Sequence, residues 1–369
     1  MQANRLLGRR NRRRQRRSEN RTLFGSIILC LITLTAVTVC MIMVLRYRAI
    51  QMENTTVLNE LDNLRLEQEA TYTQGEVEAL LTQARQETED ETKDGMLEEL
   101  KGLMASGEST IDMLKYFFPD QIVVADAGAY HFFPILQDLK HHTYNQEQLQ
   151  LDEDQVMQYY VNGEVASHRG IDVSRYQEDI DWEAVAEDGV EYAFIRVGIR
   201  GYTEGEIIGD SSFGENIKGA LSNGIQTGVY FFTQATSVEE AEEEAKYVLD
   251  QIEPYDVTYP VVIDIEAVAN ENARTADLTP EERTQYCIAF CDMIRKAGYT
   301  PMIYGNIKTF MLMLDIQQLE DYEKWYAYYD DQIYYPYAFS IWQYSDSGSV
   351  DGIKGKVDMN ISFGDWNHE

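Results

Sequence analysis

The second half of the sequence predicts an α/β barrel of eight strands and five helices, in which the last three strands follow without helices between them. Short β-branched, apolar runs recur from Gly170 onward, and amphipathic segments follow the first five of these runs. The run at 261–266 is almost wholly apolar, which is typical of a parallel strand buried on both faces. An open, doubly wound sheet is the alternative architecture.

The predicted elements alternate regularly and together form a domain at residues 169–369. The strands are expected at 170–173, 192–197, 228–233, 261–266, 300–304, 324–328, 340–344 and 357–361. The helices are expected at 182–186, 211–222, 238–252, 280–297 and 306–314. In such a barrel the active groups collect at the carboxyl ends of the strands.

Residues 1–45 predict a membrane anchor. Residues 1–22 contain nine arginines and one acidic residue, and the 23 residues at 23–45 carry no charge. A helix of that length spans a bilayer, and the arginine excess places the basic tail in the cytoplasm and the remainder outside the cell. A cleaved signal peptide is the alternative, but the apolar run is long for one and no convincing cleavage site follows. We therefore expect a single-pass protein of the cell membrane.

Two segments separate the anchor from the barrel. Residues 46–118 predict a helical or partly disordered stalk, because helical apolar patches occur but Gly75 and Gly95 interrupt any heptad pattern. Residues 119–168 predict a small β module of two hairpins, one at 122–133 and one in which 156–161 is followed by Asn162 and Gly163. The histidines in and beside this module do not have the spacing of a metal site.

Charge, cysteine and histidine content exclude several classes of function. The 369 residues carry a formal net charge of −32, and the part beyond the anchor cannot neutralise phosphates, so nucleic acid is excluded as a partner. Cys287 and Cys291 are expected to pack in the core of a helix. Residues 170–366 contain no histidine, which excludes a histidine base, a Ser-His-Asp triad and a typical zinc hydrolase. No metal or cofactor is expected.

Four carboxylates stand near the ends of predicted strands. Asp264 and Glu266 are two residues apart and point to the same side of a strand, while Asp172 and Asp358 lie on the first and last strands. If the barrel closes, these two strands are neighbours and all four acids face one small volume. Like charges so placed raise at least one pKa, which provides a general acid near neutral pH. Glycoside hydrolysis is the reaction that needs carboxylates alone, and a salt-bridged or capping pair is the alternative for 264 and 266.

Seven ordered motifs between Gly170 and Trp366 resemble those of glycoside hydrolase family 25, the Chalaropsis-type lysozymes. They are GIDVSRYQ at 170–177, FIR at 194–196, GVYFF at 228–232, DIE at 264–266, WYAYY at 325–329, WQY at 342–344 and VDMN at 357–360. The resemblance implies a flattened barrel of five helices and eight strands. It also implies cleavage of the β-1,4 bond between N-acetylmuramic acid and N-acetylglucosamine in peptidoglycan.

The same resemblance implies a role for each site residue. Glu266 would be the general acid and base, and Asp264 would orient a substrate N-acetyl group that attacks the anomeric carbon. Asp172 and Asp358 would tune this pair and bind substrate. The residues implied in substrate binding are Tyr230, Phe232, Trp325, Tyr329, Trp342 and Gln343. One departure from the family is Phe231, where many members carry histidine.

We therefore predict a membrane-tethered muramidase that trims peptidoglycan on the outer face of the cell. A wall-binding or scaffold protein, whose barrel holds glycan without cutting it, is the alternative from another class. A third possibility is an organiser that self-associates through the stalk or meets a cytoplasmic protein or anionic lipid through the basic tail.

Overall fold

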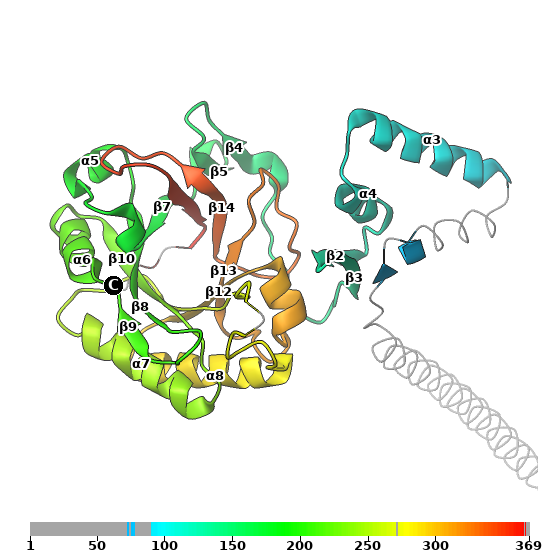
Figure 1. The fold of residues 1–369 in the computed structure, drawn as a ribbon. Helices are drawn as coiled ribbons and strands as arrows, with labels where there is room; N and C mark the ends of the chain where they lie inside the picture. The colour runs from blue at the N-terminus through cyan, green and yellow to red at the C-terminus, as the bar shows by residue number, and fades with distance from the viewer. Residues whose placement is uncertain (1–71, 74, 78–89, 271, 365, 367–369) are drawn as a thin grey trace, which may run out of the picture. The chain divides into compact units, whose positions relative to one another are not determined.

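The structure is a computed structural model that describes residues 72–73, 75–77, 90–270, 272–364 and 366 (Figure 1). All of them belong to one compact unit of the chain, Thr71–Glu369. The predicted basic tail and membrane helix, residues 1–45, therefore lie outside the described residues. Among the residues that are described, no helix is both long enough and apolar enough to cross a membrane.

Eight strands close into a barrel at residues 168–362 (Figure 1). Their bounds are β7 (His168–Val173), β8 (Tyr192–Arg200), β10 (Gln226–Phe232), β11 (Val261–Asp264), β12 (Pro301–Asn306), β13 (Glu323–Ala327), β14 (Ile341–Gly348) and β15 (Val357–Ser362). Each strand pairs with the next, β8 pairs with β10, and β15 returns to β7. The short strand β9 (Ile207–Gly209) extends β8. Ring closure confirms the predicted barrel and all eight of its strands, and it excludes the open sheet.

Helices cover the outside of the barrel after the first four strands. They are α5 (Trp182–Glu187), α6 (Phe213–Ser222), α7 (Val238–Ile252) and α8 (Pro280–Lys296). The fifth predicted helix, at 306–314, is instead a short π-helical segment, η3 (Thr309–Met313). From β13 to β15 only loops connect the strands, as the short spacings in the sequence predict.

Helix α8 illustrates how local sequence sets these elements. Thr279 and Glu282 form a capping box at its start, and Pro280 occupies the first turn, where its missing N–H is not needed. Cys287 and Cys291 are fully buried on its inner face, as predicted for core cysteines. This face packs against β11 and β12, which places the strand that carries Asp264 on a rigid support.

The strands separate two apolar layers because their side chains alternate between the two faces. One layer fills the barrel interior with Tyr192, Phe194, Tyr259, Val262, Met302, Trp325 and Ile341. The other lies between the strands and the surrounding helices. Large rings fit inside because two inward positions are glycines: a Cβ on Gly170 would lie 2.1 Å from the Tyr192 ring, and one on Gly228 would lie 2.3 Å from the Phe194 ring.

The Gly228→Ala chain is expected to be about 1–3 kcal/mol less stable than the wild type, because the added methyl group must displace a buried ring or the Pro260 carbonyl. Urea unfolding at pH 7 would measure this. Gly214→Ala in α6 is the matched control, since its Cβ would meet only the Tyr255 hydroxyl at 3.9 Å. Equal stability of both variants would show that the barrel interior is not tightly packed.

Both predicted hairpins of residues 119–168 are present. The first pairs β2 (Gln121–Asp126) with β3 (Ala129–Pro134), and the second pairs β5 (Met157–Val161) with β6 (Glu164–Val165). Asn162 and Gly163 both have positive φ, at 55° and 85°, as the two-residue hairpin turn requires. However, the hairpins belong to separate three-stranded sheets, one completed by β1 (Tyr72–Thr73) and one by β4 (Leu149–Leu151). The two hairpins therefore do not share one sheet.

The second sheet packs directly on the barrel. Strand β5 contacts β7 and β15, and its buried residues Met157 and Tyr159 belong to the layer outside the barrel strands. The Met157 backbone N–H also donates to the Tyr344 hydroxyl of β14 at 3.2 Å. The barrel therefore shares its core with residues that precede 169.

Two helices are described within the predicted stalk. Helix α3 (Asp90–Ser106) contains the predicted apolar patch and continues through Gly95, which was expected to interrupt the pattern. Helix α4 (Thr110–Phe117) is capped by the Ser109 side chain. It buries Leu114 against Val123 of β2.

Candidate active site

The four predicted carboxylates line one pocket at the mouth of the barrel, with about 330 Å³ of free space. Asp172 and Asp264 stand at or next to the last residues of β7 and β11, and Glu266 follows two residues beyond β11. Asp172 and Asp264 are buried, whereas Glu266 and Asp358 are partly exposed. The structure thus brings together the acids that the sequence placed near strand ends.

Asp358 also lies at the mouth of the barrel, but on a strand that runs in the opposite direction from its neighbours. It is the second residue of β15, not one of the last, and β15 runs antiparallel to both β14 and β7. The start of an antiparallel strand lies beside the ends of its neighbours, so Asp358 stands directly opposite Asp172 in the sheet register. The predicted proximity of these two acids is confirmed, although Asp358 lies at the start of its strand and not at a carboxyl end, where the active groups were expected to collect.

Asp172 is held by two amide side chains. Its Oδ2 accepts hydrogen bonds from Gln343 Nε2 and Asn360 Nδ2, both at 2.8 Å. Asn360 is itself fixed by the Trp325 indole N–H, which donates to its Oδ1 at 2.8 Å. Burial raises the pKa of Asp172, and the hydrogen bonds from Asn360 and Gln343 partly offset that increase. These donors favour an ionised, immobile carboxylate on the floor of the pocket.

Gln343 connects this floor to the tyrosines of the pocket. The hydroxyl groups of Tyr304 and Tyr329 donate to its Oε1, at 2.8 Å and 3.0 Å. Since its oxygen accepts from both tyrosines, its amide nitrogen must point at Asp172. One residue therefore fixes the orientation of two pocket hydroxyls and one carboxylate.

Asp264 and Glu266 form a second acid pair. Burial raises the pKa of both, and for Asp264 the negative charge of Glu266 raises it further. The interaction with Glu266 thus favours the protonated form of Asp264. No donor among the described residues reaches Asp264 Oδ1, although this atom is buried at the pocket. The raised pKa values favour protonation of at least one of the two carboxyl groups, and Asp264 Oδ1 remains available as an acceptor.

Five of the six residues implied in substrate binding line this pocket: Tyr230, Phe232, Trp325, Tyr329 and Gln343. Tyr329 is the most open of them, with 54% of its surface exposed. Trp342 does not line the pocket. It precedes Gln343 on β14 and so points to the opposite face, where it is fully buried and donates to the Tyr328 carbonyl. The implied role of Trp342 in contacting substrate is therefore wrong.

Comparison with known proteins identifies the family of this chain. The sequence model described as Glycosyl hydrolases family 25 matches residues 171–353. The uncharacterized protein YegX of Escherichia coli K12 is 32% identical over 205 residues, which cover 52% of this chain and 68% of YegX. The chain belongs to glycosyl hydrolase family 25. This confirms the enzyme class predicted from the sequence, a glycoside hydrolase.

More distant relatives agree with this family. The autolytic lysozyme of Clostridium acetobutylicum is 26% identical over 193 residues, covering 52% of this chain and 55% of that protein. Among solved structures, the modular autolysin LytC of Streptococcus pneumoniae has a TM-score of 0.50 at 24% identity, and the match covers 65% of this chain and 57% of LytC. The chain thus spans little more than half the length of these two proteins, and the likeness to LytC supports the fold alone.

Phe231, the departure from the family 25 pattern, does not contact the pocket. It is fully buried in the layer outside the strands and packs against Tyr247 of α7. Its neighbours Tyr230 and Phe232, on the opposite face of β10, line the pocket. The replacement therefore leaves the pocket lining unchanged.

The family 25 pocket also contains residues that the sequence analysis did not assign to it. Arg196 lines the pocket and forms an ion pair with Asp210, at 2.7 Å, while its guanidinium lies 5.0 Å from the centre of the Tyr176 ring. Tyr176 and Tyr304 are further pocket residues. An arginine inside an otherwise apolar strand was a usable signal, whereas the position of Tyr176 depends on a loop. No group of three or more potential metal ligands occurs among the residues described.

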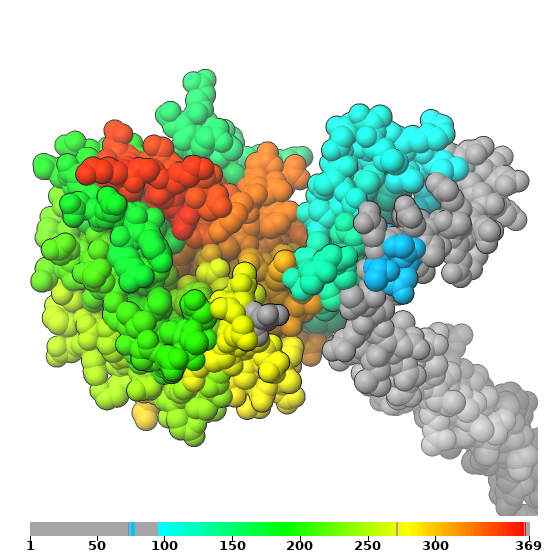
Figure 2. All heavy atoms as spheres, in the orientation of Figure 1, coloured from blue at the N-terminus to red at the C-terminus, as the bar shows by residue number. Residues whose placement is uncertain are grey.

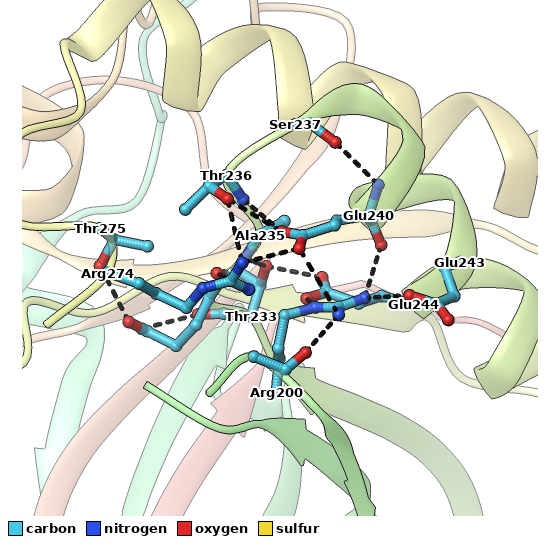
Figure 3. Close-up of polar contacts among 12 residues, drawn as sticks. Arg200, Thr233, Ala235, Thr236, Ser237, Glu240, Glu243, Glu244, Arg274 and Thr275 are labelled. Atoms are coloured by element: carbon cyan, nitrogen blue, oxygen red, sulfur yellow. Dashed lines mark hydrogen bonds and ion pairs between the residues drawn. The ribbon is translucent and has the colours of Figure 1, made fainter. Parts of the chain in front are cut away.

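A polar network behind the pocket, shown in Figure 3, joins three loops of the family 25 domain. Arg200, at the end of β8, is 3% exposed and pairs with Glu244 of α7 at 2.7 Å. It also pairs with Glu243 at 2.8 Å and donates to the Gly205 carbonyl at 2.6 Å. Burial raises the pKa of Glu244 to about 7, although hydrogen bonds from Thr233 and Arg200 oppose that increase. We call Arg200, Glu244 and Thr233 the buried brace.

A second arginine attaches the loop that follows β11. Arg274 pairs with Glu240 of α7 at 2.7 Å and donates to the Thr236 hydroxyl at 3.1 Å (Figure 3). Its neighbour Thr275 donates to Gln234 at 2.8 Å. The loop between β11 and α8, which begins beside Glu266, is therefore anchored to the loop between β10 and α7.

The Asp358→Asn chain is expected to gain up to about 5 kcal/mol of stability at pH 8, and no stability at pH 4. Burial and the neighbouring Asp172 raise the pKa of Asp358 to about 9. Because the folded state then binds a proton that the unfolded chain releases above about pH 4, stability falls as pH rises through this window. Urea unfolding at several pH values would measure the difference. A gain that does not depend on pH would contradict this explanation.

Proposed function

We propose that this protein is a lysozyme-type peptidoglycan hydrolase that cleaves the β-1,4 bond between N-acetylmuramic acid and N-acetylglucosamine. The observation that carries this proposal is that Asp264 and Glu266 line one pocket, where Asp264 Oδ1 is buried without a donor among the described residues and burial raises the pKa of both carboxyl groups. The relatives named autolytic lysozyme and N,O-diacetylmuramidase, the latter 27% identical over 164 residues, support the substrate class.

Glu266 has the position of the general acid. It is the more exposed member of its pair, so its proton can reach a glycosidic oxygen that enters from solvent. A substrate N-acetyl group whose N–H donates to Asp264 Oδ1 would stabilise the ionised form of Asp264, and the negative charge of Asp264 would then favour the protonated form of Glu266. The acetyl oxygen can then attack the anomeric carbon while Glu266 protonates the leaving oxygen, and Glu266 later acts as base toward water.

The second acid pair shapes the pocket around this reaction. Asp172, fixed by Gln343 and Asn360, maintains a negative charge that keeps the pKa of Glu266 high and stabilises the positive charge that develops at the anomeric carbon. The aromatic rings of Tyr230, Tyr329 and Trp325 provide faces for sugar rings.

The proposed reaction is tested with the full chain and purified peptidoglycan. We expect new reducing ends, and identification of the new reducing sugar as N-acetylmuramic acid. The full chain is required because β5 packs on the barrel, so a chain starting at Gly170 would expose part of its core. A folded chain that binds peptidoglycan and releases no reducing ends would instead support the wall-binding alternative.

We further propose that residues 23–45 anchor the enzyme in the cell membrane with the barrel outside. The uncharged run and the nine preceding arginines support this topology. Protease added to intact cells should degrade the barrel, and a chain lacking residues 1–45 should leave the membrane fraction. A barrel that is protected from protease until the cells are lysed would contradict the proposed orientation.

A further inference from the structure

The loop between β13 and β14, residues 328–340, contributes to one wall of the family 25 pocket. Tyr329 of this loop lines the pocket, and its hydroxyl donates to Gln343 at 3.0 Å. The Asp330 N–H donates to the Tyr328 carbonyl at 3.1 Å, which makes a turn around Tyr329. The position of this turn therefore determines where the Tyr329 side chain lies in the pocket.

The barrel supports the two ends of the loop. At its start, the Tyr328 N–H donates to the Gln343 carbonyl at 3.0 Å, and the Tyr328 carbonyl accepts the Trp342 indole N–H at 2.8 Å. At its end, three aromatic side chains are buried in the layer outside the strands: Tyr335, Tyr337 and Phe339. Residues 329–334, between these ends, are exposed or half-buried. This middle part is the one that carries the pocket residue.

The middle part of the loop is held by residues that precede the barrel. Lys115 Nζ of α4 donates to the Tyr328 hydroxyl at 2.7 Å and lies 4.5 Å from the centre of the Tyr334 ring. The Tyr334 hydroxyl in turn accepts the Val123 backbone N–H of β2 at 2.6 Å. In Figure 2 the cyan and teal part of the chain, which includes α4, lies against the orange part of the barrel.

A third residue holds the same part of the loop from the other side of its turn. Gln146, in the short 3-10 helix η1 (Gln146–Gln148), donates from Nε2 to the Asp331 carbonyl at 2.8 Å. Its Oε1 accepts the Ile333 N–H at 2.9 Å. We call Lys115, Val123 and Gln146 the loop clamp. All three residues precede residue 171, where the family 25 match begins.

Polar contacts, more than close packing, join α4 to the loop. A groove with about 620 Å³ of free space lies between them, lined by α4 residues and by Tyr328, Asp330 and Tyr334. The Lys115 side chain is only 18% exposed, so water competes poorly for its hydrogen bond to the loop. Loss of a single member of the loop clamp should therefore change the position of the loop measurably.

We infer that Lys115 and Gln146 are positioning residues for the active site: by fixing residues 328–334, they keep Tyr329 in the pocket wall and increase the affinity of the pocket for glycan. That glycan is the ligand rests on the proposed function. Because α4 belongs to the predicted stalk, the inference also links the stalk directly to the pocket wall.

The position of the loop is tested without substrate. In the full chain, Lys115→Met or Gln146→Ala should make amide hydrogen exchange in residues 328–334 about 3- to 10-fold faster. Methionine keeps the length of the lysine stem but cannot donate a hydrogen bond. Lys140→Met is the matched control, because this lysine also joins the preceding segment to the barrel, through Asp321 at 3.2 Å, but away from the loop.

The effect on the pocket is tested by a double-mutant cycle. In a chain that carries Glu266→Gln to prevent cleavage, Lys115→Met or Gln146→Ala should weaken binding of a peptidoglycan tetrasaccharide about 3- to 10-fold. The same replacements should have no further effect once Tyr329 is replaced by alanine, because the loop clamp acts through this side chain. With Glu266 intact, they should raise KM with little change in kcat.

Unchanged hydrogen exchange in both clamp variants would overturn the inference. An equal loss of tetrasaccharide binding with and without the Tyr329 side chain would also overturn it, because the clamp would then act on the fold in general. The proposed function can fail separately. If the intact chain releases no reducing ends while Lys115→Met still weakens binding only in the presence of Tyr329, the proposed reaction is wrong and the role of the loop clamp stands.

Discussion

Replacing Glu266 by glutamine is expected to reduce the rate of peptidoglycan cleavage by at least about 100-fold, and by as much as about 10,000-fold. Glutamine keeps the size of the side chain and can hydrogen-bond to Asp264, but it cannot give a proton to the leaving oxygen. The loss should appear in kcat, while binding of glycan to the folded chain remains. Release of reducing ends from purified peptidoglycan measures kcat, and titration with soluble glycan measures glycan binding.

The pH profile separates this role from a structural one. Because burial raises the pKa of Glu266, the wild-type rate should fall on the alkaline side as this group loses its proton. The residual activity of the Glu266→Gln chain should lack that fall. Glu242→Gln, on the exposed side of α7, is the control and should keep both the rate and the profile. A Glu266→Gln chain with near wild-type activity would remove this residue from the mechanism.

Replacing Arg200 by leucine is expected to destabilise the protein by about 3–5 kcal/mol, the cost of leaving a buried charge without its partner. The buried brace would lose the guanidinium that faces Glu244, and the carbonyl of Gly205 would lose its donor. Glu244 is fully buried, so water cannot replace these contacts. Urea unfolding monitored by tryptophan fluorescence would measure the change.

Two further variants define the origin of that loss. The double replacement Arg200→Leu with Glu244→Leu removes both charges and should recover part of the stability. Lys246→Ala breaks an exposed pair with Asp250 on the same helix, and should cost less than about 0.5 kcal/mol. If the Arg200→Leu and Lys246→Ala chains were equally stable, the brace would not contribute to holding the loops behind the pocket.

Much of the barrel could be predicted from the sequence because its signals are local. Buried strands such as 261–264 can be predicted from continuous apolar runs. The pair Asn162 and Gly163 predicts a hairpin turn because both residue types readily adopt the positive φ that such a turn requires. The further strand with which each hairpin pairs is not encoded in the residues of the hairpin itself. The sequence therefore predicted two hairpins correctly, but it could not show that they belong to different sheets or that one of them completes the barrel core.

In the candidate site, too, local features could be predicted from the sequence, whereas contacts between distant residues could not. Acids near strand ends were visible in the sequence, and closure of the barrel brought Asp172 and Asp358 together as predicted. The role implied for Trp342 was wrong because a shared sequence motif does not show to which face of the strand a side chain points. The alternation with Gln343, its neighbour on β14, would have indicated that only one of them faces the pocket. The roles of Asn360 and Arg196 depend on partners from other elements, which sequence spacing does not reveal.

The position of β15 also determines when the protein can fold during its synthesis. This strand completes the barrel by pairing with β7, which lies nearly two hundred residues earlier in the chain, and it contacts β5, which is earlier still. Contacts between such distant segments form slowly, and exposed strand edges promote aggregation until they form. Strand β7 therefore lacks this partner until residues 357–362 have been synthesised, and the Asp172–Asp358 pair cannot form before then.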